Sequence, residues 1–180
     1  TQMISYAAQA KSAVDQMLYS NASIANLNFI LPTQATFNTP PHMNKIYHPD
    51  GGGLNPGRIP DEAVYQTSTD PVAGWYMSRF NNIEWTKTTA TDVILIAWQI
   101  KKQVCERINS KITGSTAIPT LTASIPNTMI DESFHAGANV DLTTDPAGTP
   151  ICAACHKRSS LCVEDLGGGR YGFYTVIADR

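Results

Sequence analysis

The chain has 180 residues, of which 42% are hydrophobic and 16% charged, and its formal net charge is −2. This length and composition predict one folded domain with a real hydrophobic core and argue against wholesale disorder. Because the sequence contains no block of basic residues, nucleic acid is not expected as a partner. No stretch has the pattern of a membrane span or signal peptide, so the chain as given is expected to be soluble.

The first stretch, Thr1 to about Leu27, is predicted to form one long amphipathic helix, and we assign residues 1–29 to it. No Gly or Pro occurs before Pro32, and Ala, Gln, Lys, Met and Leu all favour helix. At 1.5 Å per residue the helix would be about 40 Å long and would overhang a small domain. Its apolar residues recur every three or four positions, on one stripe: Met3, Ala7, Ala10, Val14 and Met17.

Residues 30–71 are predicted to be a loop-rich connection, because their prolines and glycines leave little room for regular structure. A segment of this length without its own elements is expected to lie over the core or to carry function. We favour the first interpretation. The side chains expected to anchor the segment are its large apolar ones: Phe37, Met43, Ile46, Tyr47 and Leu54.

Residues 72–180 are predicted to form the head of the molecule. Residues 73–86 contain an alternating pattern that predicts one or two strands. A second helix is predicted over about 91–112, with Thr91 as N-cap and Gly114 as its stop. Its expected buried stripe is Val93, Ala97, Ile100, Val104 and Ile108.

The C-terminal part, about 159–178, is predicted to be a hairpin of two strands joined by a glycine-rich turn. The last strand carries bulky side chains on both faces, so we expect it in the interior of the sheet and covered by a helix. The predicted elements define an α+β fold: a long N-terminal helix packed on an antiparallel sheet, with an internal helix and a loop-rich head.

Four cysteines, Cys105, Cys152, Cys155 and Cys162, favour disulfides and an oxidising, extracytoplasmic compartment. The preferred pairing joins Cys105 to Cys162 and Cys152 to Cys155. The first bridge would clamp the internal helix to the hairpin and contribute about 4 kcal/mol by the chain-entropy relation. The competing pairing joins Cys155 to Cys162 and Cys105 to Cys152.

The run from Cys152 to His156, CAACH, has the spacing that attaches c-type haem through two thioethers and an axial imidazole. With Cys162, the same groups offer a Cys₃His set for zinc. We favour disulfides over both metal sites and predict no cofactor.

No catalytic constellation is apparent, and we predict that the protein is not an enzyme. The glycine-rich run His48–Gly53 has no strand before it and no Lys-Ser/Thr after it, so it is predicted to be a surface turn and not a phosphate-binding loop. The nucleophile-elbow and zinc-protease motifs are also missing from the sequence.

The predicted layout resembles bacterial type IV pilins and the pseudopilins of type II secretion. Three stretches are also similar to bacterial pilin-like proteins: residues 48–53 (HPDGGG), 104–109 (VCERIN) and 172–177 (GFYTVI). The defining signature of the family, a cleavage site followed by Phe and by a Glu within an apolar half-helix, is not present. We therefore expect that Thr1 follows a point where a membrane-spanning half-helix has been removed.

The resemblance implies a single pilin-like domain over residues 1–180 and a structural role in a filament. The implied partners are other pilin or pseudopilin subunits, and the implied location is the periplasm or cell surface, with the precursor anchored in the inner membrane. Arg at Ala10 or Ala13 is expected to leave the head folded and to block assembly, and the turns near Met3 and Ile4 are expected to contact neighbours. The helix residues that fit assembly are Met3, Ile4, Ala7, Ala10, Ala13, Val14 and Met17.

Two alternatives belong to other classes of protein. One is a periplasmic electron carrier with c-type haem on Cys152, Cys155 and His156. The other is a secreted binding module or adhesin that uses residues 40–60 as its contact surface.

Overall fold

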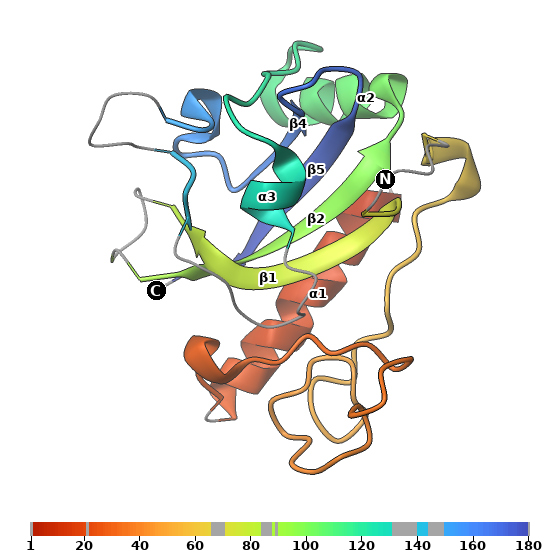
Figure 1. Ribbon diagram of the computed structural model, residues 1–180, viewed down its shortest axis with the longest axis vertical. Helices are drawn as coiled ribbons and strands as arrows, with labels where there is room; N and C mark the ends of the chain where they lie inside the picture. The colour runs from red at the N-terminus through yellow and green to blue at the C-terminus, as the bar shows by residue number, and fades with distance from the viewer. Residues whose placement is uncertain are drawn as a thin grey trace.

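A computed structural model describes residues 2–20, 22–65, 71–83, 88, 90–130, 140–143 and 150–179. The protein has an α+β fold, as predicted, built on one twisted sheet (Figure 1). The sheet order is β3-β1-β2-β5-β4, in which β1, β2, β5 and β4 are antiparallel and β3 pairs with β1 in parallel. The strands are β1 (Gly74–Asn82), β2 (Asp92–Ile100), β3 (Val140–Asp141), β4 (Ser160–Glu164) and β5 (Tyr171–Ala178).

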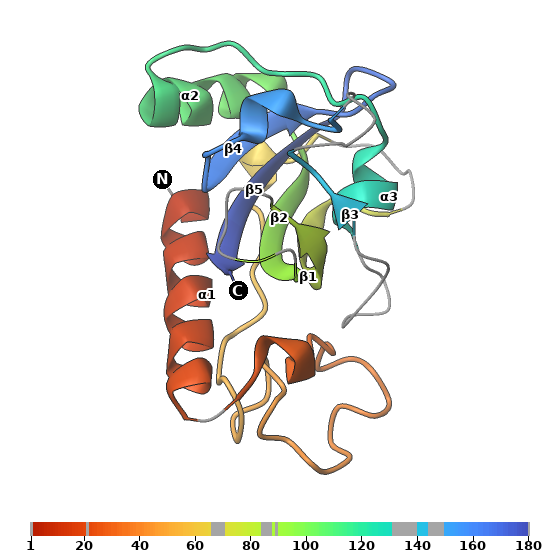
Figure 2. The same ribbon diagram turned by 90° about the vertical axis from the view of Figure 1, so that its left-hand side faces the viewer.

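Helices cover both faces of the sheet, so the sheet separates two hydrophobic cores (Figure 2). On one face lie α1 (Gln2–Tyr19) and α2 (Lys102–Thr113), and on the other lies the short α3 (Ile125–Met129). Alternate side chains of a strand point to opposite faces. In β2, the core shared with α1 receives Val93, Leu95 and Ala97, and the core shared with α3 receives Ile94, Ile96 and Trp98.

The first half of the predicted helix over 91–112 is wrong, because Asp92–Ile100 is strand β2 and α2 begins only at Lys102. All nine residues of β2 are buried, since the strand lies between β1 and β5 in the middle of the sheet. A run that is apolar on every side fits a strand covered on both faces, and its β-branched residues favour that state. The predicted stop is confirmed, because Gly114 caps α2 with a φ of 80°.

Helix α1 is shorter than predicted: it ends at Tyr19, and its 18 residues span about 27 Å. The amide of Ala22 donates to Met17 O at 3.0 Å, which turns the chain away from the helix axis. Ser23 then caps a separate 3₁₀ turn, Ile24–Asn26, through its side chain. Ser and Asn favour such caps and turns over helix interiors, and this explains the early end.

The predicted stripe of α1 is buried in the core that it shares with β5. Because the stripe follows the helical period, one side of α1 faces the sheet along its whole length. In Figure 2, α1 runs alongside the sheet, and no helix or strand that is drawn as a ribbon covers its other side.

The loop-rich prediction for residues 30–71 holds for the described residues 30–65, where the 3₁₀ turn Asp61–Ala63 is the one helical element. The first part of the loop lies beneath the sheet, beside the C-terminal end of α1, and its last part runs up to the sheet, where Val64 pairs with Ile100 of β2 (Figures 1 and 2). Four of the predicted anchors are buried, Phe37, Ile46, Tyr47 and Leu54, whereas Met43 is 59% exposed. The loop therefore covers the core, as expected.

The C-terminal hairpin is confirmed. β4 pairs with β5, with Cys162 opposite Phe173. Gly168 and Gly169 in the connection have φ values of 73° and 77°, a region that favours glycine. β5 lies between β2 and β4 under α1, as its two apolar faces predicted.

The two disulfides are those of the preferred pairing, Cys105–Cys162 and Cys152–Cys155. The first joins α2 to β4 and so fastens the helix to the sheet. Both disulfides are in keeping with an oxidising, extracytoplasmic setting. Within the described ranges, no helix combines the length and the apolarity that crossing a membrane requires.

Candidate functional site

The uncovered side of α1 is the candidate site, and we call it the α1 flank: Ile4, Ala8, Ser12, Asp15 and Tyr19. These residues are spaced four, four, three and four apart, so they form one line on the helix. All are exposed, and Tyr19, at the C-terminal end of the line, is 93% exposed. The flank therefore has a large apolar side chain at each end, the small Ala8 and Ser12 at its centre, and the charged Asp15 next to Tyr19.

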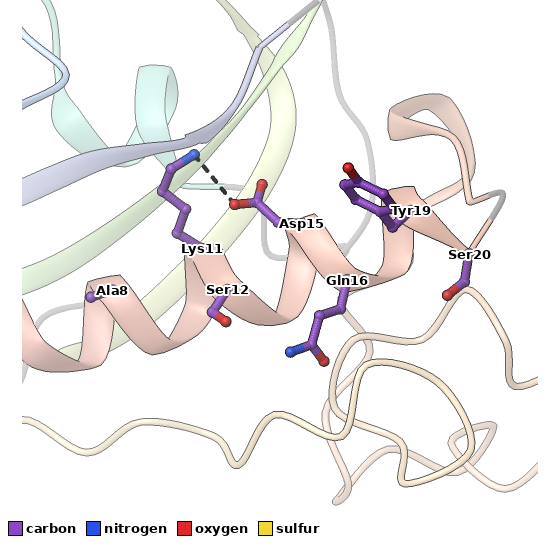
Figure 3. Close-up of a pocket in the computed structure, with 7 residues that line it drawn as sticks. All are labelled: Ala8, Lys11, Ser12, Asp15, Gln16, Tyr19 and Ser20. Atoms are coloured by element: carbon purple, nitrogen blue, oxygen red, sulfur yellow. Dashed lines mark ion pairs between the residues drawn. The ribbon is translucent and has the colours of Figure 1, made fainter.

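A shallow hollow follows the C-terminal half of this flank, between Ala8 and Ser20 (Figure 3). Lys11 and Asp15 point toward each other along one side of the hollow, with Nζ 3.8 Å from Oδ2. Lys11 Nζ also donates to Ile177 O of β5 at 3.2 Å. Because this lysine ties α1 to the sheet and balances Asp15, the hollow has no net charge and offers small and polar groups to a neighbour.

The sequence-predicted assembly residues fall into two groups in the structure. Ile4 is exposed at 37%, and Ala13 is half-buried. The remaining five pack in the chain's own core: Met3, Ala7, Ala10, Val14 and Met17. Their burial means that contacts with a neighbour have to come from the other side of the helix.

Two sequence-based expectations about α1 are therefore wrong. Ala10 is 0% exposed, so Arg at this position would place a cation in the core and would not leave the head folded. Met3 is 5% exposed and belongs to the core, so it does not overhang the head. The amphipathic pattern could have identified Ala8, Ser12 and Tyr19 as the exposed side, but nothing local in sequence shows that Lys11 reaches β5.

A second hollow lies where the loop meets α1. Ala13, Gln16 and Met17 line it from the helix, and Gly51 and Gly52 line it from the loop. A Cβ on Gly52 would lie 2.7 Å from Met17 Sδ and 2.6 Å from Ile46 O. Glycine is therefore required here, because the loop backbone at Ile46 and the Met17 side chain of the helix leave no room for a Cβ.

The predicted turn at His48–Gly53 is confirmed. Gly51 N–H donates to His48 O at 2.9 Å, Gly52 N–H to Lys45 O at 3.0 Å, and Gly53 N–H to His48 O at 3.0 Å. These amides are occupied by the chain's own carbonyls, so they do not form a cradle for phosphate.

The CAACH run takes the form of a small disulfide loop. Cys152 and Cys155 are buried and joined to each other, and His156 is exposed. In this form neither sulfur is available for a thioether to haem. Cys162 lies in the core on the opposite face of the sheet from Cys152 and Cys155, so the three sulfurs do not converge on one zinc ion. Among the described residues, no group of three or more His, Cys, Asp or Glu is arranged to hold a metal.

The largest pKa shifts belong to tyrosines that are buried or half-buried in the fold. Burial raises the pKa of Tyr6 to about 12, and burial likewise raises the pKa of Tyr47 and of Tyr174. Tyr6 donates through its hydroxyl to Asn55 O at 3.0 Å, and Tyr174 donates to Arg158 O at 2.8 Å. Tyr6 thus connects α1 to the loop, and Tyr174 connects β5 to the residues just ahead of β4.

Comparisons of the chain with protein-family models, with curated proteins and with solved structures give no significant match.

Proposed function

We propose that the protein is a structural subunit of a filament of the type IV pilin or type II secretion pseudopilin kind, and that it assembles through the α1 flank. The observation that carries this proposal is the division of α1 into one side buried against β5 and one exposed side with small residues at its centre. Small side chains let another helix approach closely, and the exposed Ile4 and Tyr19 supply apolar area at the two ends.

The rest of the fold supports the same role. An N-terminal helix, a crossing loop, an antiparallel sheet and a disulfide-fastened C-terminal region occur in the order that the pilin resemblance implies. The partners are then other pilin or pseudopilin subunits, and the precursor is held in the inner membrane by a segment ahead of α1. The role is one of assembly and not of catalysis.

The test is a charged, bulky substitution at the centre of the flank. Ser12→Arg in the full-length gene product should abolish filaments, since a long cation would stand between two close helices. Ser110→Arg is the matched control, because Ser110 is exposed on α2, away from the flank. Filaments are counted by electron microscopy of the native host, and far-UV circular dichroism of both purified variants should match that of the wild type. A Ser12→Arg protein that assembles as well as Ser110→Arg would refute assembly through this flank.

The two alternatives, a c-type haem electron carrier and a secreted binding module, differ in their support. The haem carrier receives none from the geometry of Cys152, Cys155 and His156. A contact surface at residues 40–60 stays a prediction, with Met43 as its most exposed large apolar side chain.

A further inference from the structure

Residues 36–54 fold around the ammonium group of Lys45, and we call this segment the clasp. Lys45 is 6% exposed, and its Nζ donates to Thr36 O at 3.2 Å, Phe37 O at 2.8 Å and Thr39 O at 2.5 Å. Its fourth neighbour is His42 Nδ1, at 3.3 Å. No carboxylate in the described part of the chain lies within ion-pair distance of it. The clasp therefore contains a buried positive charge that is balanced only by dipoles.

Two stacked imidazoles stand beside this charge. The rings of His42 and His48 are 3.8 Å apart between centroids and 6° from parallel. His48 is buried, with Phe37 against it at 4.9 Å, and its Nδ1 accepts the N–H of Asp50 at 3.1 Å. Lys45 has three N–H donors and three carbonyl acceptors, so His42 Nδ1 can at most share one of these donors, and only an unprotonated Nδ1 can do so. Both Nδ1 atoms thus face a donor, which is Lys45 Nζ at His42 and the Asp50 N–H at His48.

Protonation of His42 conflicts with this arrangement. A proton on Nδ1 replaces an acceptor by a donor that faces another donor, and it adds a second positive charge next to Lys45. Partial burial lowers the pKa of His42, and the neighbouring His48 and Lys45 lower it further, while Asp50 acts in the opposite direction. The Asp50 carboxylate is 4.0 Å from His48 Nδ1, but its side chain is 77% exposed, so solvent screens most of its effect.

We propose that the clasp is an acid-sensitive cover on α1: neutral His42, stacked on His48, keeps it closed around Lys45, and protonation of His42 loosens it. The loop beneath the sheet in Figure 2 contains this segment. Gly52 packs on Met17 of α1, and Ile46 and Leu54 share the core of that helix. Loosening uncovers the C-terminal half of the α1 stripe, beside the α1 flank. The clasp does not depend on filament assembly, so the two proposals can fail separately.

The direction of the pH effect follows from linkage. A base whose pKa is lower in the folded state binds more protons when unfolded, so folding loses stability as the pH falls below the unfolded value, about 6.5 for histidine. The loss continues until the pH passes below the folded pKa and then levels off. The clasp should therefore be closed at pH 7.5 and looser at pH 5.

Hydrogen exchange followed by mass spectrometry tests this on the intact protein. Because the intrinsic exchange rate of an amide itself depends on pH, each measured rate is divided by the intrinsic rate at that pH. Only the protection given by the structure is then compared between the two pH values. Peptides covering residues 42–54 should lose protection by about tenfold between pH 7.5 and pH 5. Peptides of the central strand β2 should keep theirs. Equal loss in both regions, or loss in neither, overturns the proposal.

Asparagine variants separate protonation from packing, because the Oδ1 atom of Asn can replace Nδ1 as an acceptor but does not titrate. In His42→Asn/His48→Asn, protection at residues 42–54 should no longer depend on pH. His156→Asn is the control, since His156 is exposed, follows the Cys152–Cys155 disulfide and lies outside the clasp. This variant should keep the wild-type response.

If the double variant does not fold, His42→Asn alone should shrink the response, and NMR titration of the wild-type rings gives an independent measurement. Ring titrations near pH 6.5 with no accompanying change in the amides of residues 42–54 would refute the acid-sensitive clasp.

Discussion

At the scale of single residues, the side chain of Asn109 in α2 forms hydrogen bonds with β4 that a neighbouring strand would otherwise form. Its Nδ2 donates to Cys162 O at 2.9 Å and to Ala117 O at 2.9 Å, and its Oδ1 accepts the N–H of Cys162 at 2.8 Å. β4 is the last strand of the sheet, so its outer edge would otherwise carry unpaired backbone groups. Next to it, Glu164 N–H donates to Pro119 O at 2.8 Å, and Leu121 N–H donates to Glu164 O at 2.9 Å. The outer edge of β4 is thus closed to the addition of another strand at these positions.

Asn109→Ala should lower the free energy of unfolding by about 2–4 kcal/mol, because it leaves the buried backbone N–H and C=O of Cys162 without their partner. Urea unfolding measured by circular dichroism checks this. Ser110→Ala, an exposed neighbour on the same helix, should change the value by less than about 0.5 kcal/mol. Equal stability of the two variants would mean that water replaces the amide. Sequence reasoning could not anticipate this residue, because an Asn on a helix gives no sign of a partner that is 53 positions away.

At the scale of elements, the spacing of apolar residues predicted α1 and failed for β2. The stripe of α1 has polar residues between its members, so only the helical period fits it. In residues 93–98 every side chain is apolar, and such a run contains a helical stripe as well as both faces of a strand. The run forms a strand and not a helix because it lies between β1 and β5, and this position depends on segments that are distant in sequence. The α1 flank was predictable as an exposed face, whereas the clasp depends on contacts between a buried lysine and carbonyls of a loop that has no periodic pattern.

The close packing of the backbone within the clasp can be tested at this scale with a single methyl group. Gly52→Ala would place a Cβ 2.6 Å from Ile46 O and 2.9 Å from Ile46 Cα, atoms of backbone that cannot move aside without shifting the loop. We expect a loss of about 1–3 kcal/mol in the free energy of unfolding and faster hydrogen exchange in residues 42–54 at neutral pH. Gly167→Ala is the control, since the nearest atom to its Cβ would be at 3.6 Å. Similar exchange in both variants would show that the backbone of the clasp is not closely packed at Gly52.

At the scale of the whole molecule, the two disulfides hold the chain together in different ways. Cys105–Cys162 connects α2 to β4 across 57 positions in sequence, and its sulfurs lie in the core that α1 and α2 share. Cys152–Cys155 spans 3 positions on the other face of the sheet. A crosslink restricts the unfolded chain more strongly when it closes a longer loop. The first bridge therefore contributes to global stability, and the second mainly fixes a local turn.

Paired alanine variants should separate these contributions. By the chain-entropy relation, Cys105→Ala/Cys162→Ala should lower the free energy of unfolding by about 4 kcal/mol and Cys152→Ala/Cys155→Ala by about 2 kcal/mol. Both pairs remove two buried sulfurs, so the loss of packing is similar and the difference reflects loop length. Urea unfolding of the oxidised proteins gives the values, and wild-type protein under strong reductant should fall at least as low as the first variant. The reverse order would show that strain or residual structure in the unfolded chain, and not loop closure, governs how the disulfides stabilise this α+β head. Asn109 and packing alone would then be enough to hold α2 against β4.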